Sequence, residues 1–73
     1  MATEKILSEI TGKVWKIMTP EGSTVAEEDA IVVVESMKME IPVLATCTGS
    51  VETLHVAEGD DVAEGQLVAT LKR

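Results

Sequence analysis

Lys38 is the residue of this sequence best placed to do chemistry, because its type and its neighbours are unusual for the position. It lies in the stretch Glu35-Ser36-Met37-Lys38-Met39-Glu40, which separates two strand-like runs at 30–35 and 39–44. If Met37 and Lys38 form a two-residue turn, the two runs pair through apolar residues on facing strands. The predicted pairs are Val34 with Ile41, Val32 with Val43, and Ile31 with Leu44. The sequence therefore predicts a hairpin with the lysine at its tip.

This predicted turn breaks three local rules. Two-residue hairpin turns need positive φ and favour Gly or Asn, and Met37-Lys38 offers neither. The same register puts Glu35 opposite Glu40, which is a destabilising like-charge pair. Met37 and Met39 would also expose apolar side chains. Conflicts of this kind concentrate at functional sites, where strain and exposure are used.

An exposed lysine at the apex of a hairpin can enter the active site of another enzyme and act as a nucleophile. A lysine amine is mostly protonated at neutral pH, so an acylating enzyme must first remove a proton. The flexible, polarizable side chains of Met37 and Met39 suit a recognition surface. From these residues alone the prediction is a modified or recognised lysine, and an ordinary solvent-exposed turn lysine is the alternative.

The elements that must position the tip come from an internal repeat at an offset of 37 residues. Across residues 11–34 and 48–71, 8 of 24 positions are identical. Each unit reads as strand, turn, short strand, turn, strand, and the Thr-Gly step that opens it suits a tight turn or bulge. Runs at 5–9 and 39–44 add a strand before each unit. The expectation is two packed halves with about eight strands and the hairpin between them.

Composition supports a small all-β fold. The 73 residues suffice for one domain, predicted to span residues 1–73. Ten Val, five Ile and five Leu accompany a single aromatic residue, Trp15, and branched residues favour strands. The net charge of −7 argues against nucleic acid and anionic membranes as partners. No run of the chain is apolar for the length of a membrane span, and the lone Cys47 fits a reducing, cytoplasmic compartment.

The stretch around Lys38 resembles the attachment motif of a known protein family. Glu35-Ser36-Met37-Lys38-Met39 is similar to the Glu-Ala-Met-Lys-Met attachment motif of biotinyl domains in the biotinyl/lipoyl attachment family, and the match extends over the whole chain. The resemblance implies a flattened eight-stranded barrel-sandwich hybrid of two quasi-symmetric four-stranded halves. It implies biotin attached covalently to Lys38, with Met37 and Met39 as neighbours for ligase recognition. Glu35, Ser36 and Glu40 match the flanking motif, although Ser36 departs from the commoner Ala.

The function implied by the resemblance is that of a small stand-alone biotin carrier protein or an excised carrier domain, and not of an enzyme. Biotin protein ligase would biotinylate it, and it would then carry carboxyl groups as carboxybiotin between a biotin carboxylase and a carboxyltransferase. The isolated domain is expected to be a monomer. A lipoyl carrier and an unmodified barrel-sandwich binding module stay open as alternatives, as do an apo form with a free lysine and the identity of the acceptor substrate.

Three other residues have ordinary interpretations. A catalytic thiol at Cys47 would need His55 as its base, with no third orienting group evident. One Cys and one His do not make a metal site. His55 aligns with Met18 across the repeat and reads as a strand residue. Trp15 aligns with Glu52 and is expected to be half-exposed, as a partner contact or a packing residue. No catalytic residue and no metal ligand are therefore predicted.

Overall fold

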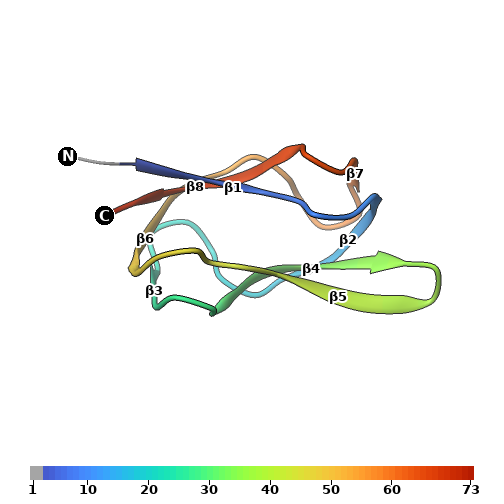
Figure 1. The fold of residues 1–73 in the computed structure, drawn as a ribbon, viewed down its shortest axis with the longest axis horizontal. Helices are drawn as coiled ribbons and strands as arrows, with labels where there is room; N and C mark the ends of the chain where they lie inside the picture. Colours follow the sequence, from blue (N-terminus) through green and yellow to red (C-terminus); the bar gives the residue numbers. More distant parts are fainter. Residues whose placement is uncertain (1–2) are drawn as a thin grey trace.

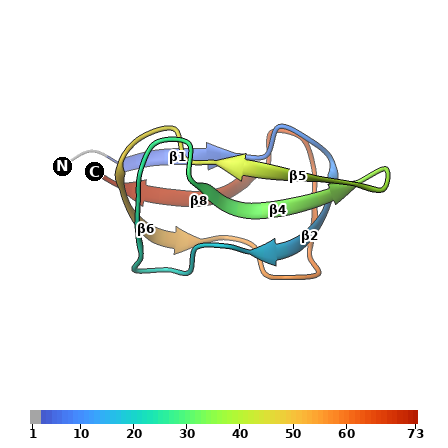
Figure 2. The same cartoon turned by 90° about the horizontal axis from the view of Figure 1, so that it is seen from below.

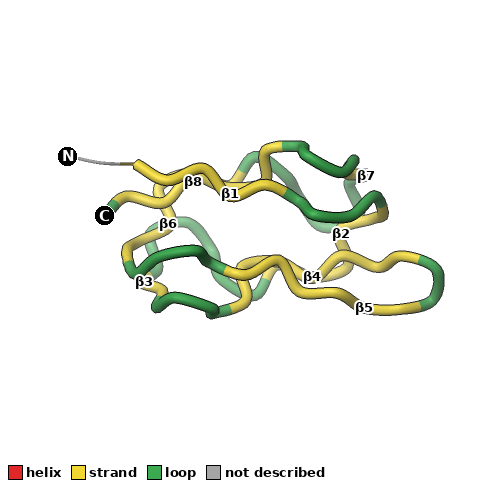
Figure 3. Tube along the Cα trace, in the orientation of Figure 1, coloured by secondary structure: helices red, strands yellow, loops and turns green. Residues whose placement is uncertain are grey.

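The regular secondary structure of the described residues consists of strands alone, joined by the loops and turns that Figure 3 shows. The computed structural model describes residues 3–73, and within that range it contains no helix, and thus none that could cross a membrane. The strands are β1 (Thr3–Leu7), β2 (Gly12–Ile17), β3 (Thr24–Val25), β4 (Ala30–Ser36), β5 (Met39–Leu44), β6 (Gly49–Leu54), β7 (Asp61–Val62) and β8 (Leu67–Lys72). The all-β prediction is confirmed. Residues 1 and 2, which the predicted domain includes, lie outside the described part.

The first strand ends earlier than predicted. β1 stops at Leu7 instead of continuing to Glu9, because the next residue begins a local turn. The Ser8 hydroxyl donates a hydrogen bond to the Ile10 carbonyl (2.6 Å) and accepts one from the Ile10 N–H (3.3 Å). A serine that bonds its own neighbouring backbone offers the chain an alternative to the strand ladder.

Two four-stranded antiparallel sheets form the molecule, in the orders β1-β8-β6-β3 and β5-β4-β2-β7. The 37-residue repeat relates β1 to β5, β2 to β6, β3 to β7 and β4 to β8, so it exchanges one sheet for the other. Each sheet contains two strands from each half, and the short strands β3 and β7 pair with the other half's β6 and β2. In Figure 1 the β1–β8 pair of one sheet lies above the β4–β5 pair of the other, and Figure 2 shows the same strands turned by 90°. The halves therefore interlock, because each sheet is completed by strands from both of them.

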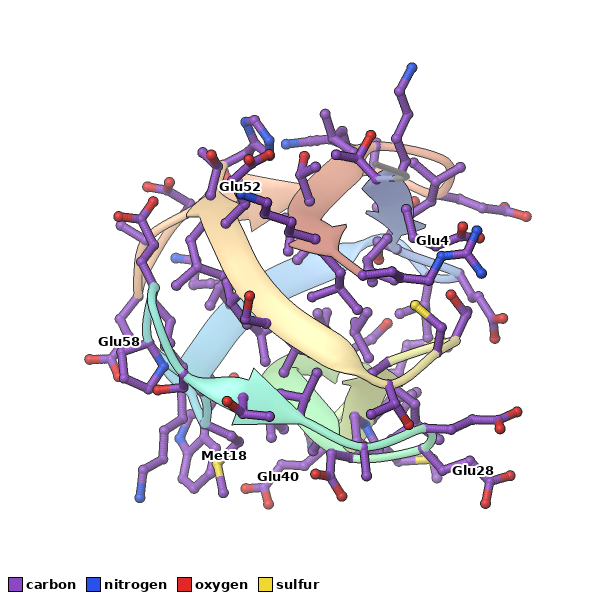
Figure 4. The ribbon with its side chains drawn as sticks, turned by 90° about the vertical axis from the view of Figure 1, so that its left-hand side faces the viewer. Glu4, Met18, Glu28, Glu40, Glu52 and Glu58 are labelled. Atoms are coloured by element: carbon purple, nitrogen blue, oxygen red, sulfur yellow. The ribbon has the colours of Figure 1, made fainter. Side chains whose placement is uncertain are left out.

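The core between the sheets is built from small branched side chains. Its buried residues occur largely as repeat-related pairs: Ile6 and Val43, Val14 and Val51, Val25 and Val62, Ile31 and Val68, Val32 and Ala69, Val34 and Leu71. Side chains alternate between the two faces of a strand, so the opposite faces are free to carry charge. Figure 4 shows the labelled glutamates of several elements pointing outward around the barrel.

Glutamates tie the halves together at equivalent places. The Ile17 N–H donates to Glu58 Oε2 at 3.1 Å, and the Leu54 N–H donates to Glu21 Oε2 at 2.8 Å. Each bond joins the end of a long strand in one half to a turn in the other. The two N–H donors lie close to the bulges in β2 and β6, where the ladder is locally disrupted. Each carboxylate therefore satisfies a backbone group next to a gap in the ladder.

The glycines that open the repeats have a different purpose from the predicted one. Gly12 and Gly49 are the first residues of β2 and β6, not turn residues. A Cβ on Gly49 would lie 2.5 Å from the Lys72 carbonyl oxygen, and one on Gly12 would collide with the Glu35 carbonyl oxygen. Glycine is needed because two backbones approach closely, which leaves no room for a side chain.

Candidate functional site

The hairpin of β4 and β5 carries the six residues singled out by sequence. Ser36 pairs with Met39, Glu35 with Glu40, and Val34 with Ile41, so Met37 and Lys38 are the two central residues of the turn. Their φ angles are 51° and 66°, the positive values that such a turn requires. The predicted turn and these registers are confirmed. The predicted roles of the six residues stay predictions.

One predicted pair is wrong. Leu44 pairs with Ala30 and not with Ile31, because β4 has an irregularity between Ala30 and Val32. The Ile31 carbonyl instead accepts hydrogen bonds from the Met18 N–H (2.9 Å) and the Thr19 N–H (3.1 Å) on the other side of the strand. An extra residue of this kind shifts the register by one position, and no local sequence signal marks it.

The tip projects from the end of the molecule that is opposite to the chain termini, as Figures 1 and 2 show. The molecule measures 37 × 18 × 18 Å, so it is elongated. At the tip Met37 is 92% exposed and Met39 is 63% exposed, and Lys38 is exposed as well. Val34, at 0% exposure, anchors the base of the hairpin in the core. The lysine is thus held at the apex of an arm with a fixed base.

The charges beside the tip are specific to this hairpin. Across the sheet of β4, facing positions form a row of Asp61, Lys13, Glu35 and Glu40. The repeat-related row of the other sheet consists of Thr24, Ser50, Lys72 and Thr3. The fold therefore does not require the Glu35–Glu40 pair. Lys13 lies next to Glu35 and offsets part of the repulsion between the two carboxylates. Because Lys13 and Asp61 are distant in sequence, sequence reasoning did not find them.

The side chains of this row form no ion pair with one another. Among residues 3–73 the one pair within 4.0 Å joins Arg73 and Glu4, at 3.7 Å, at the end that holds the termini. The same residues enclose no pocket, and no three His, Cys, Asp or Glu side chains among them cluster as a metal site would need. The site is consequently a protruding side chain and not a cleft.

The remaining candidate residues lie elsewhere. Cys47 is partly buried and packs against the core. His55 lies just beyond the end of β6 and not within the strand as predicted. Its Nε2 lies 3.0 Å from Thr70 Oγ1. Trp15 is 50% exposed, as predicted, at the bulge in β2. None of the three lies in the β4–β5 hairpin.

Comparison with known proteins identifies the family. Residues 5–71 match the biotin/lipoyl family model, described as "Biotin-requiring enzyme". The chain is 40% identical to the biotinylated protein TB7.3 homolog of Mycobacterium leprae, over 93% of this chain and 96% of that protein. It is 35% identical to the biotin/lipoyl attachment protein of Bacillus subtilis, over 86% of each.

A solved structure agrees. The urea carboxylase of Kluyveromyces lactis superimposes with a TM-score of 0.93 and 36% identity, over 99% of this chain but 6% of that one. The chain thus spans nearly all of the small mycobacterial protein and a small part of the carboxylase. The likeness confirms the predicted barrel-sandwich fold, and with the family match it makes covalently bound biotin the cofactor of the domain. The chain belongs to the biotin/lipoyl family of biotin-requiring enzymes and is a biotin carrier domain homologous to those of carboxylases.

Proposed function

We propose that Lys38 is the residue that carries biotin, and that the domain is a non-catalytic carrier. The observation that supports this most is the geometry of the turn, which places the Lys38 amine at the apex of a fixed hairpin. Attachment needs a free primary amine that another enzyme can surround. With no pocket around it in residues 3–73, this amine fits such a requirement.

Attachment converts the lysine amine into an amide. A biotin protein ligase would remove a proton from the ammonium, and Nζ would then attack an activated biotin carboxyl group. The new C–N bond forms as the activating group leaves with its bonding electrons. Met37 and Met39 would supply the apolar surface that the ligase recognises, since thioether side chains adapt to different partners. Ser36, Glu35 and Glu40 would complete the recognised stretch.

When bound, biotin supplies a ring that can accept and release a carboxyl group. The contribution of the chain is positional, because a tethered group has a high effective concentration at every site that the tether reaches. We propose a biotin carboxylase and a carboxyltransferase as those sites, which the likeness to a urea carboxylase supports. A monomeric carrier in the cytoplasm agrees with the free thiol of Cys47. Size-exclusion chromatography and cell fractionation test these two points.

The test of the attachment site is modification in vitro. The domain is incubated with a biotin ligase, ATP and biotin, and is then examined by intact mass, avidin binding and isoelectric focusing. We expect one biotin per chain and a net charge one unit more negative than −7, because an ammonium becomes a neutral amide. Lys38→Arg should abolish the reaction, and Lys13→Arg, on an exposed strand position, should not. Biotinylation of the Lys38→Arg variant would show that another residue carries the cofactor.

Lipoylation is the second candidate, because the Bacillus subtilis relative is named for both groups. The same assay with a lipoyl ligase and lipoate distinguishes the two. A domain that accepts lipoate but not biotin would reverse our assignment. A domain that accepts neither would favour an unmodified binding module.

A further inference from the structure

Two of the four methionines of this chain flank Lys38 at the tip, and they are the most exposed large apolar side chains of the described residues. Met37 is 92% exposed and Met39 is 63% exposed, whereas Met18 is 48% exposed. Met18 follows β2 on the flank of the barrel, as Figure 4 shows. Met37 therefore presents nearly all of its surface to any reagent in solution.

We propose that Met37 and Met39 form an oxidation site through which a hydroperoxide switches off modification of Lys38. The regulatory part rests on the proposed function, and the oxidation itself does not. The thioether sulfur attacks one peroxide oxygen and the O–O bond breaks. The sulfur is oxidised by two electrons to a sulfoxide. The leaving peroxide oxygen takes up the proton released from the transferred hydroxyl, so hydrogen peroxide is reduced to water and an organic hydroperoxide to its alcohol. Methionine sulfoxide reductases reverse the change, one enzyme for each sulfoxide epimer.

Exposure predicts the order of oxidation. If the rate follows exposed surface, Met37 reacts about 1.9 times as fast as Met18, from 92% against 48%. Hydrogen peroxide is neutral, so the Glu35–Glu40 pair next to the tip does not repel it. An anionic oxidant would be repelled by this pair and by the net charge of −7. A neutral hydroperoxide is therefore the reagent that fits the site.

The consequence of oxidation follows from the position of these side chains. A sulfoxide is polar and chiral, and it disrupts methionine-rich contact surfaces. At the tip it changes no core packing, because Met37 and Met39 lie outside the buried core. Folding should therefore be unaffected, and recognition of the tip by a ligase should be lost. Because both methionines flank the lysine directly, one oxygen atom alters the surface that a ligase must contact.

The experiment separates oxidation from its effect. The unmodified domain is treated with hydrogen peroxide, the peroxide is removed with catalase, and peptide mass mapping follows one-oxygen additions at each methionine, Met1 included. Biotin ligase, ATP and biotin are then added. We expect Met37 to be oxidised before Met18 and the initial rate of biotinylation to fall about thirtyfold, the size of a lost hot-spot contact. Methionine sulfoxide reductases A and B together should restore the rate.

Matched variants locate the effect. Met18→Leu should leave both the basal rate and its sensitivity to peroxide unchanged. In Met37→Leu/Met39→Leu the ratio of treated to untreated rates should be close to one, whatever the basal rate. An oxidised tip that is biotinylated at the untreated rate overturns the proposal, as does oxidation of Met18 before Met37. If the untreated domain is not biotinylated, the proposed function fails and the regulatory role with it, while the mapping still tests the oxidation order.

Discussion

Replacing Met37 with Asn should make the domain more stable and a poorer substrate for modification. The turn holds two non-glycine residues at φ angles of 51° and 66°. A left-handed conformation costs an ordinary residue about 1–2 kcal/mol, and Asn bears it more easily because its short polar side chain bonds locally. Met37 is 92% exposed, so almost no packing is lost. We expect the free energy of unfolding to rise by about 1 kcal/mol.

Urea unfolding followed by far-UV circular dichroism measures this gain. Fluorescence is a weaker probe, because the only aromatic residue, Trp15, is already 50% exposed in the folded state. A gain of about 1 kcal/mol corresponds to a rise in Tm of roughly 4–8 °C for a domain of this size. With an m value of about 1–2 kcal/mol/M, the urea midpoint should rise by roughly 0.5–1 M.

The matched control is Met37→Leu, which removes the thioether but leaves the backbone penalty. Its stability should equal that of the original domain. If Met37→Asn is no more stable than Met37→Leu, the turn stores no strain at this residue and our physical reason for singling out the hairpin is wrong. Biotinylation assays on the same variants should show the opposite order, with Met37→Asn modified more slowly than the original domain.

Four further substitutions test the packing and backbone of the hairpin and of the segments next to it, each by urea unfolding. Val34→Ala should lower the free energy of unfolding by about 2 kcal/mol, because a fully buried side chain is truncated. Val33→Ala, on the opposite face and only partly buried, should cost clearly less, and equal costs would contradict the assigned faces. Glu28→Gly should raise stability by up to about 1 kcal/mol, because Glu28 has a φ of 76°, and a loss would contradict this. Gly12→Ala should cost about 1–3 kcal/mol, because its Cβ would collide with the Glu35 carbonyl, and a neutral result would show that the strands can separate there.

Much of the site was readable from local sequence. The alternation around Met37-Lys38 predicts the register from Glu35–Glu40 to Val32–Val43, because side chains of facing strands must share a face. The predicted register failed at Ile31. Its carbonyl accepts hydrogen bonds from the Met18 and Thr19 N–H groups, which belong to a different segment. The predicted purpose of Gly12 failed similarly, since its neighbour is a backbone 23 positions away. Interactions between distant segments leave no local pattern.

The sequence by itself determined the all-β class, the two-fold repeat and the lysine at a strained turn between the repeats. Each of these follows from side-chain type and spacing along the chain. Only the tertiary structure decided that β3 and β7 pair with β6 and β2 of the other half, and that Lys13 and Asp61 share a row with Glu35 and Glu40. Strand order depends on which edges bury the most apolar surface together, and that is a property of the assembled molecule. The position of Lys38 depends on both local sequence and tertiary packing. Local sequence forms the turn that holds the lysine, and the packing of the two sheets decides that this turn projects from the free end of the molecule.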